Sequence, residues 1–288
     1  MEIHRASGGL SAAQGVPQRH FISRRSKDEE FDTQIDILRT RIKDSDDLNV
    51  EDAVFDSRTL MDLYSLSSKG IIDALGGSIC TGKEANIFRA LGSGKELALK
   101  IYRISTSNFK AMQDYLHGDP RFGSVKGTKR AIVSAWTKKE FRNLTRAEEA
   151  GVRVPHPIAM RGNILVMDFV GQNDHAAPQL KDAGLEVEEA KRVFGRLVEY
   201  ISLLYHKAGL VHADLSEFNI LYTGEPVIID MGQSVTLDHP MARKFLERDI
   251  TNIVRYFQKR YGFGSEEDIW ARLKSDKREE ETDRKKGG

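Results

Sequence analysis

The stretch that decides the fold is residues 210–221, which read LVHADLSEFNIL. It places Asp214 five residues before Asn219, between two apolar runs, and Asp230 follows eleven residues later at the end of the apolar run 227–229. Two carboxylates and an amide oxygen in this order can orient an acceptor hydroxyl and hold a divalent cation against phosphate groups. The pattern therefore predicts a phosphoryl-transfer site around these three side chains.

The elements on either side of the stretch determine how those side chains meet. Apolar residues at helical spacing predict a helix over 190–205. Two short strands, 220–222 and 227–229, should place Asn219 and Asp230 at neighbouring strand ends. An Asp and an Asn at this spacing are also common in ordinary turns. With these flanking elements, and with Asp-Met-Gly starting at Asp230, the pattern is instead typical of a kinase catalytic loop and metal-binding aspartate.

The composition bounds the class of protein. The 288 residues can form one large domain or two lobes around a cleft, and the formal net charge of +1 gives no overall basic field that would indicate DNA as a partner. The single cysteine, Cys80, excludes an internal disulfide and a zinc cluster, and we expect its thiol to be buried. No run of about 18 apolar residues is present, and the N-terminus lacks the apolar core of a signal peptide. We therefore expect a cytoplasmic protein without membrane contact.

The N-terminal part predicts a tail and two helices. Residues 1–50 are rich in Gly, Ser, Gln and charge and predict a mobile tail. Its patch 31–42 has helical spacing but is too short to form a stable helix alone. The apolar spacing that follows predicts a helix over 57–66 and a second, short helix over 71–75.

Residues 77–84, GSICTGKE, imitate a P-loop. Glu84 stands where that motif needs a Ser or Thr for magnesium. A P-loop also opens a helix, whereas 85–90 predicts a strand, and 96–102 predicts another strand after a Gly-Ser-Gly turn. We interpret 77–84 as a hairpin of small residues whose backbone N–H groups lie over phosphates.

The strand 96–102 contains Leu-Ala-Leu-Lys, which matches in type the Val-Ala-Ile-Lys of kinases. Its Lys100 is predicted to pair with nucleotide phosphates, although a lysine in an isolated strand can also face water at a sheet edge. A helix predicted over 134–150 carries Glu140 near its middle. Glu140 is therefore the preferred partner of Lys100.

Two more strands, 158–160 and 164–167, precede a segment with the pattern of a kinase hinge. The segment is Asp-Phe-Val-Gly and runs from Asp168 through Val170 to Gly171. Its backbone is expected to contact adenine, with Met167 as the gatekeeper side chain.

An insert over 103–131 separates the lysine strand from the next helix. Its Gly, Pro and Ser residues interrupt any period, so we expect a partly helical, mobile loop. Such a loop presents its hydroxyls at high effective concentration to a nearby site. Ser105, Ser107 and Ser124 are therefore the candidate autophosphorylation sites.

Only 58 residues follow Asp230. They predict helices over 241–261 and 266–273 and then a charged tail over 274–288. An ordinary protein kinase needs an activation segment and several more helices to bind a peptide, and this length does not supply them.

Taken together, the motifs resemble the RIO atypical protein kinases, and among them the type-1 branch, over residues 51 to about 275. The resemblance lies in Ser-x-x-Thr-Gly-Lys-Glu-Ala-Asn at 78–86, Gly-Asp-Pro-Arg-Phe at 118–122 and His-Ala-Asp-Leu-Ser-Glu-Phe-Asn at 212–219. The type-2 branch begins with a winged-helix domain, which the N-terminal segment has no room for. Cys80 departs from the pattern, which has a serine there, and a thiol is a weaker hydrogen-bond partner for phosphate.

The resemblance implies a small bilobal α+β fold of the protein-kinase type. An N-lobe over 51–170 would hold an antiparallel sheet with one main helix, and a reduced helical C-lobe would span 171–274. The resemblance also implies ATP as substrate, Mg²⁺ or Mn²⁺ as cofactor, serine autophosphorylation, and work on the pre-small-subunit ribosomal particle with its RNA and protein.

Roles for individual residues follow from the same resemblance. Lys100 would contact phosphate, and the backbone at Asp168 and Val170 would hold adenine. Asp214 would be the base, and Asn219 and Asp230 would bind the metal. The other residues expected around ATP are Ser78, Thr81, Gly82, Lys83, Glu84, Ala85, Met167 and Glu140.

Three alternatives stay open. A small-molecule phosphotransferase of the aminoglycoside type uses a similar loop, but such enzymes usually devote a large C-terminal helical region to the acceptor. A non-catalytic assembly factor could use ATP only to hold one shape on a ribosomal precursor. Asp230 could also attack the γ-phosphorus itself and form an aspartyl-phosphate, which would make the protein an ATP hydrolase.

Overall fold

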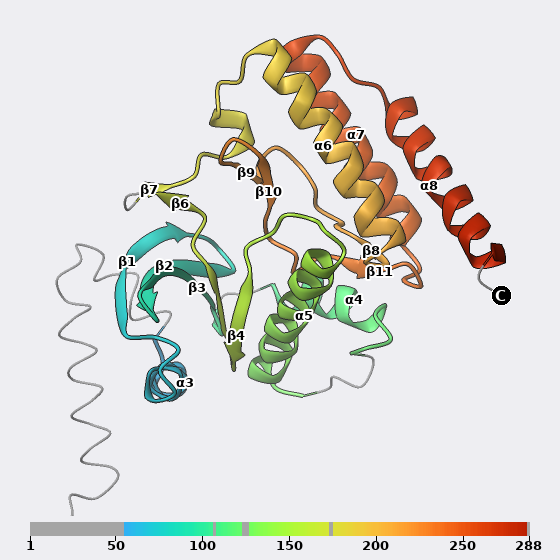
Figure 1. Cartoon of the computed structure of the whole chain (residues 1–288). Coiled ribbons are helices and arrows are strands. Elements are labelled where there is room, and N and C mark those ends of the chain that lie inside the picture. Colours follow the sequence, from blue (N-terminus) through green and yellow to red (C-terminus); the bar gives the residue numbers. More distant parts are fainter. Residues whose placement is uncertain (1–54, 106–107, 123–126, 173–174, 287–288) are drawn as a thin grey trace, which may run out of the picture.

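The computed structural model describes residues 55–105, 108–122, 127–172 and 175–286 (Figure 1). The expected tail 1–50 with its patch 31–42, and the candidate Ser107 and Ser124, lie outside these residues. The helices are α3 (Ser57–Ser68), α4 (Phe109–His117), α5 (Lys129–Glu149), the 3-10 turn η1 (Leu180–Asp182), α6 (Val187–His206), α7 (Ala242–Tyr261) and α8 (Glu266–Lys286). The strands are β1 (Ala74–Thr81), β2 (Ala85–Gly92), β3 (Lys95–Tyr102), β4 (Pro157–Arg161), β5 (Ile164–Asp168), β6 (Gly171–Gln172), β7 (His175–Ala176), β8 (Leu210–Val211), β9 (Ile220–Tyr222), β10 (Pro226–Ile228) and β11 (Val235–Thr236).

A five-stranded sheet forms one half of the molecule, with the strand order β1-β2-β3-β5-β4. All neighbouring strands are antiparallel. β2 and β3 pair without interruption from Ala85 and Tyr102 to Gly92 and Lys95, so the predicted hairpin is present. The other half is mainly helical, and the α+β class expected from the sequence is confirmed.

Strand β3 shows why this sheet positions a functional side chain. Leu97, Leu99 and Ile101 are buried in a cluster that includes the apolar face of α3. Side chains alternate across a strand, so Ala98 and Lys100 point to the opposite face, where Ala98 joins the core cluster shared with the helical half. Helix α5 contacts β4 and β5 and reaches Lys100 from that face. The strand therefore places its lysine between the two halves.

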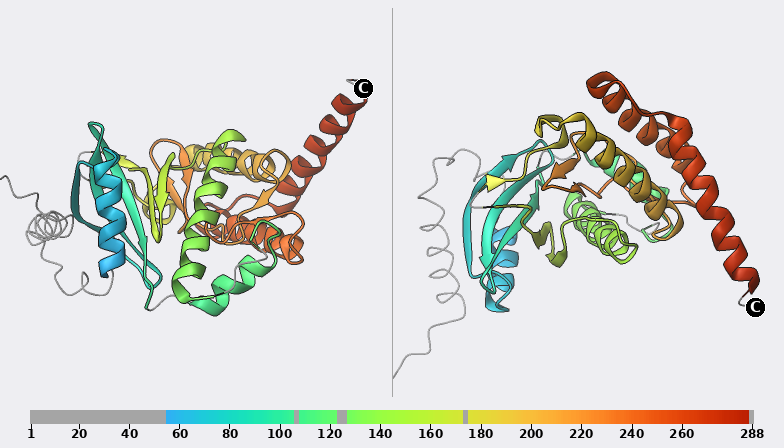
Figure 2. Two further views of the ribbon diagram at one scale, coloured as in Figure 1. Left: turned by 90° about the horizontal axis from the view of Figure 1, so that it is seen from below. Right: turned by 45° about the horizontal axis from the view of Figure 1, so that its top comes forward.

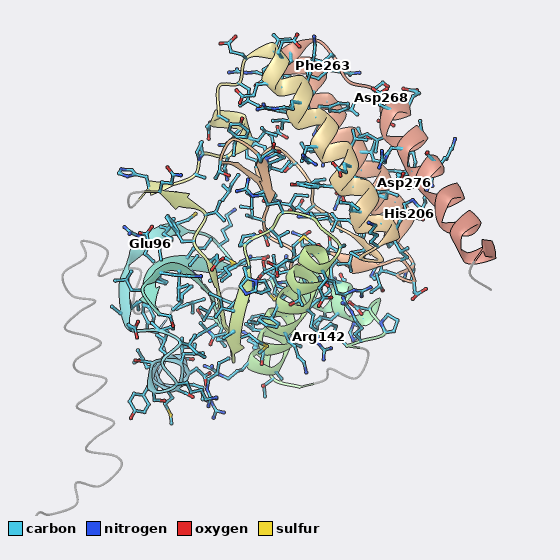
Figure 3. All side chains as sticks on the ribbon, viewed as in Figure 1. Glu96, Arg142, His206, Phe263, Asp268 and Asp276 are labelled. Carbon is cyan, nitrogen blue, oxygen red and sulfur yellow. The ribbon has the colours of Figure 1, made fainter. Side chains whose placement is uncertain are left out.

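The helical half is built on α6 and α7, which lie side by side in all views (Figures 1 and 2). Helix α8 packs along α6, and its inner side is held by polar contacts as well as apolar ones. Ser202 Oγ donates to Asp276 Oδ2 at 2.6 Å, and His206 Nε2 donates to the carbonyl of Leu273 at 2.8 Å. Figure 3 shows His206 and Asp276 together between the two helices. These contacts fix the first half of α8 on the domain.

The predicted short helix over 71–75 is wrong. Helix α3 ends at Ser68, and Gly70 follows in the left-handed conformation, with φ 69°. The chain then enters the sheet: Asp73 N donates to the carbonyl of Leu91 at 2.7 Å, and β1 begins at Ala74. Tertiary pairing with β2 therefore overrides the weak local helix signal.

Two other helix bounds also differ from the prediction. Helix α5 begins at Lys129 instead of 134, because Thr128 caps it by accepting a hydrogen bond from Ala131 N at 3.3 Å. Helix α8 continues through most of the expected charged tail to Lys286 instead of ending at 273. Residues 274–286 contain no Gly or Pro, so nothing in the local sequence stops the helix.

Within the described ranges, no helix combines the length and the apolar character needed to cross a membrane.

Candidate active site

A cleft of about 670 Å³ opens between the sheet half and the segment that follows β10. Ser78 and Thr81 lie outside its lining, and so do Asp214 and Asn219. Asp214 still reaches the cleft, because its Oδ2 accepts a hydrogen bond at 3.3 Å from Nε2 of the lining residue Gln233. The predicted ATP-site and metal-site residues that line the cleft are Gly82, Lys83, Glu84, Ala85, Lys100, Glu140, Met167, Asp168, Val170 and Asp230.

Lys100 is a buried cation between two carboxylates. Its Nζ donates to Glu140 Oε1 at 2.8 Å and to Asp230 Oδ1 at 2.9 Å, so the predicted pair with Glu140 is present. Tyr102 donates its hydroxyl hydrogen to the other oxygen of Glu140. Burial alone would lower the pKa of Lys100, but the carboxylates of Asp230 and Glu140 raise it well above its ordinary value. The lysine therefore stays charged at neutral pH.

Asp214 and Asn219 are held together at the mouth of this site. Asn219 Nδ2 donates to the backbone carbonyl of Asp214 at 2.8 Å and to its Oδ2 at 3.1 Å. Ile229 N donates to the carbonyl of Asn219 at 3.0 Å, which brings the end of β10 beside the start of β9 as the spacing predicted. Partial burial, followed by the nearby carboxylate of Asp230, raises the pKa of Asp214.

The backbone on either side of Asp214 is fixed by helix α7. Ala213 has a φ of 67°, which is unfavourable for a residue with a Cβ. Asp249 accepts hydrogen bonds from Ala213 N at 2.7 Å and from Leu215 N at 2.9 Å, and Arg248 donates to the carbonyl of Ala213. Burial raises the pKa of Asp249 to about 7 against the effect of these donors. These bonds keep the loop in its strained shape.

His212 connects the catalytic loop to the end of β10. Its Nδ1 accepts a hydrogen bond from Asp214 N at 3.3 Å, so its Nε2 carries the hydrogen and donates to the carbonyl of Ile229 at 3.0 Å. Burial lowers the pKa of His212 to about 4. The imidazole is therefore neutral and acts as a spacer, not as an acid or base.

Helix α5 holds the segment after Asp230. Lys139 Nζ donates to the carbonyls of Gly232, at 2.7 Å, and Ser234. Asn143 Nδ2 donates to the carbonyls of Met231, at 2.9 Å, and Ser234, at 3.0 Å. Both side chains are fully buried, and burial lowers the pKa of Lys139 to about 7. The helix that carries the carboxylate of the ion pair thus also sets the position of the metal-binding segment.

The hairpin between β1 and β2 covers one side of the cleft. Gly82 N donates to the carbonyl of Ala85 at 3.0 Å, and a Cβ on Gly82 would lie only 2.9 Å from that oxygen. Ser78 and Thr81 share a hydrogen bond of 3.3 Å at its edge. Burial, followed by Asp230, raises the pKa of Glu84. Strand β2 follows the turn directly, so the P-loop reading is excluded.

The expectation that Cys80 is buried is wrong. Its thiol is exposed and lines the cleft. Among the described residues, β1 is the outermost strand of the sheet and pairs only with β2, so its side chains are flanked by a neighbouring strand on one side alone. The departure at Cys80 therefore faces the site where ATP was predicted to bind.

The predicted hinge forms the far wall of the cleft. Met167 is 9% exposed at the back of the site, which suits a gatekeeper position. Phe169 N donates to the carbonyl of Glu96 at 3.3 Å, and the carbonyl of Val170 accepts a hydrogen bond from Ala177 N at 2.9 Å. These backbone hydrogen bonds fix the segment that connects the sheet half to the helical half along one wall of the cleft.

The side chains at the mouth suit a magnesium ion. Asn219 uses its Nδ2 for Asp214, which leaves its Oδ1 as the atom for a cation. Asp230 uses Oδ1 for Lys100, and its side chain is 45% exposed, so Oδ2 is accessible. Magnesium typically takes one or two protein oxygens and completes its shell with phosphate and water. The donor set fits that requirement.

Comparison with known proteins identifies the family. The RIO domain family matches residues 86–269. The RIO-type serine/threonine-protein kinase Rio1 of Haloferax volcanii is 49% identical over 237 residues, which cover 82% of this chain and 79% of that protein. This chain belongs to the RIO family. With a second archaeal relative, Rio1 of Methanocaldococcus jannaschii, at 42% identity over 82% of both chains, it is a Rio1-type serine/threonine kinase.

Other relatives are longer or more distant. The human serine/threonine-protein kinase RIO1 is 43% identical over 223 residues, and the matched region is only 39% of that protein. Among solved structures, the ADP/Mg²⁺-phosphoaspartate complex of the Rio2 kinase from Chaetomium thermophilum aligns with a TM-score of 0.57 and 26% identity, over 75% of this chain and 66% of that one. The small kinase-like α+β fold is therefore confirmed.

Sequence reasoning missed several residues of this RIO site. Lys139 and Asn143 fall at core-facing positions of α5, and Asp249 falls between buried Leu246 and Ile250 on α7. Polar residues within an apolar helical stripe need buried partners, so their positions were the available signal. Gln233 offered no such signal.

Proposed function

We propose that this RIO kinase binds magnesium-ATP in the 670 Å³ cleft and transfers the γ-phosphoryl group to a serine or threonine hydroxyl. The observation that carries the proposal is the convergence of Lys100, Asp230 and the Asp214–Asn219 pair from three separate segments on one cleft. In this arrangement phosphate, metal and acceptor hydroxyl have adjacent partners, as phosphoryl transfer requires.

On this proposal, each part of the cleft has a task. The backbone from Asp168 to Val170 contacts adenine, and the hairpin around Gly82 directs N–H groups to the phosphates. Lys100 neutralises phosphate charge and is kept charged and in place by Glu140. Because the lysine already has a buried counter-ion, its ammonium needs no reorganisation when phosphate arrives.

The loop supplies the remaining groups. Asn219 Oδ1 and Asp230 would hold magnesium, which when bound supplies positive charge against the β- and γ-phosphates. Asp214 orients the acceptor hydroxyl and accepts its proton. The pKa of Asp214 is raised and so lies closer to neutral pH, which favours proton transfer by this carboxylate.

The test compares three variants with one control. Asp214→Asn should keep ATP affinity and lose about 10²-fold to 10⁴-fold in transfer rate, because only the group that handles the acceptor is removed. Lys100→Ala and Asn219→Ala should weaken magnesium-ATP binding as well as turnover. Asp182→Asn, at an exposed carboxylate on η1, is the control. Calorimetry measures ATP affinity and phosphate transfer measures turnover for all four proteins. If Asp214→Asn loses ATP binding as strongly as it loses transfer, the role assigned to Asp214 is contradicted.

A second reaction at the same site is favoured by the Rio2 structure, which is an ADP/Mg²⁺-phosphoaspartate complex. In this chain an oxygen of Asp230 would attack the γ-phosphorus and form an acyl-phosphate while the bond to the bridging oxygen breaks and ADP leaves. Water would then hydrolyse the acyl-phosphate to restore the carboxylate and release phosphate. The sum is ATP hydrolysis through a covalent intermediate.

The cellular setting we propose is cytoplasmic maturation of the small ribosomal subunit, which rests on the family resemblance alone. If the protein acts there as a kinase or hydrolase, cells with Asp214→Asn and cells with Lys100→Ala should both accumulate the precursor particle. If ATP only holds the protein in one shape, Asp214→Asn should support maturation and Lys100→Ala should not. Among the residues that the structure describes, no feature of the cleft favours a small-molecule acceptor.

A further inference from the structure

Helix α7 carries a row of cations that the proposed chemistry does not use. Lys244, Arg248, Arg255 and Lys259 are all exposed. At 3.6 residues per turn, their spacing places them within about 60° of one another around the helix axis. We call these four residues the basic row. Helix α7 contacts both α6 and α8, and it lies beside α6 in Figure 1.

Nearby acids do not neutralise the basic row. Within the described residues, none of its four cations forms an ion pair. Glu247 is engaged by Arg243 at 2.7 Å, and Glu266 accepts a hydrogen bond from Thr251 at 2.7 Å. A third acid, Glu217, acts electrostatically on Tyr256, on the neighbouring face of α7. The row is therefore available to an anionic partner.

One member of the row touches the catalytic loop. Arg248 donates to the carbonyl of Ala213, directly before Asp214, and its charge acts on the Asp214 carboxylate. Asn252, one turn further on, donates to the carbonyl of Leu215 at 3.2 Å. The basic row therefore begins beside the residue at which the acceptor hydroxyl is proposed to sit.

We propose that the basic row binds an acidic segment of the protein substrate, three to five residues from the accepted hydroxyl. At a rise of about 1.5 Å per residue, Arg255 and Lys259 stand about 10 Å and about 16 Å along the helix from Arg248. An extended peptide advances about 3.3 Å per residue, so these distances correspond to about three and about five residues. This inference rests on the proposed kinase function and specifies its substrate class.

The surroundings of the row favour an acidic peptide over RNA. Proteins that bind single-stranded RNA usually combine basic side chains with exposed aromatic rings on which bases stack. Of the aromatic residues on α7 between Lys244 and Lys259, Tyr256 and Phe257 are buried, and the half-buried ring of Phe245 is covered by the guanidinium of Arg248. The net charge of +1 also provides no general attraction for a polyanion.

The experiment measures kcat/KM for peptides with one serine in a neutral background of alanine and glutamine. In one peptide, glutamates replace the residues three, four and five positions before the serine. In a second peptide, they replace the residues three, four and five positions after it. Wild-type enzyme should prefer one glutamate peptide by about tenfold, the size that a few exposed ion pairs near a site can supply. The preference should shrink as salt is raised.

The variant R255E/K259E should lose this preference to within about twofold. Its kcat/KM for the neutral peptide should stay unchanged, because a peptide without charged side chains forms no ion pair with the row. R260E/K274E is the matched control: it makes the same change in charge at two exposed positions outside the row and should keep the preference.

Three results would overturn the inference: no preference in wild-type enzyme, a preference that survives in R255E/K259E, or a single-stranded RNA whose binding is lost in that variant while peptide preference is unchanged. Autophosphorylation with magnesium-ATP is followed in the same reactions. Its absence in wild-type enzyme would contradict the proposed function itself, so the two failures are distinguishable.

Discussion

Two roles are proposed for the carboxylate of Asp230, as a metal ligand and as a nucleophile. Its backbone is left-handed, with φ 63°, and one oxygen lies 2.9 Å from Lys100 Nζ while the side chain remains 45% exposed to the cleft. The lysine lowers the pKa of Asp230, so the carboxylate is ionised and can bind a metal or act as a nucleophile. Metal binding draws charge from the oxygen and makes it a poorer nucleophile. The two roles therefore compete for the same electrons.

The hydroxylamine sensitivity of labelled enzyme separates these roles. If Asp230 is phosphorylated, enzyme incubated with γ-labelled ATP should lose part of its label to hydroxylamine, which cleaves acyl-phosphates and leaves phosphoserine intact. Asp230→Asn should abolish that fraction. Asp238→Asn, a remote carboxylate in the same segment of chain, should keep it. Label that resists hydroxylamine in every variant would leave Asp230 as a metal ligand alone.

At the level of single residues, the sequence revealed the groups that stand in short linear motifs. Asp214, Asn219 and Asp230 could be predicted because their spacing is fixed by one loop and two short strands. The supporting Asp249 could not, because it is 35 residues away from Asp214 and only the packing of α7 brings it there. Cys80 was misjudged because exposure depends on strand order, which the local sequence does not contain.

Helix α5 is the element that connects the ion pair with the metal-binding segment. On one helical face it presents Glu140 to Lys100, and Lys139 with Asn143 to the carbonyls that follow Asp230. Any shift of α5 would therefore move both groups together. The buried Lys139 adds a pH dependence to this arrangement, because burial lowers its pKa from an ordinary 10.5 to about 7.

We expect the free energy of unfolding to rise with pH between 7 and 10 through Lys139. In this window the folded protein has released the proton and the unfolded chain still binds it, so unfolding takes up a proton and becomes harder as pH rises. The slope can reach about 1.4 kcal/mol per pH unit. Lys139→Met should remove this rise, and urea unfolding from pH 7 to 9.5 measures it. Lys138→Met, at the exposed neighbouring position, should keep the wild-type slope. Equal slopes in all three proteins would show that the pKa is not lowered.

The observed ends of α5 and α8 show that the spacing of apolar residues does not by itself predict where a helix begins or ends. The apolar period of α5 starts later than the helix itself, because its first turn is fixed by the Thr128 cap and not by burial. Along α8 the period fades after Leu273, but charged residues with good helix propensity continue the helix. The hairpin β2–β3 was predictable because its turn and both strands are local, whereas the start of β1 depended on pairing with Leu91.

At the level of the whole molecule, the insert is tethered on both sides to the machinery of the cleft. It follows β3 directly after Tyr102, and its last residues lead into α5. Within it, Arg121 pairs with Asp119 at 2.6 Å and donates to Asn143 Oδ1 at 2.9 Å, which ties the insert to the helix that positions Asp230. The described part of the insert therefore stays close to its own active site.

This tether predicts that autophosphorylation occurs within one molecule and in the insert, at Ser105, Ser107 or Ser124. An acceptor on the same chain has an effective concentration near the millimolar range, so the rate per molecule should not change with enzyme concentration. Mass spectrometry after incubation with magnesium-ATP should place the phosphate between residues 103 and 131, and S105A/S107A/S124A should lose it. Ser65→Ala and Ser68→Ala, on α3 across the sheet, are the controls and should keep it. Phosphate confined to residues 1–50, or a rate that rises in proportion to enzyme concentration, would contradict transfer through the insert, since the acceptor would then reach the cleft by another path.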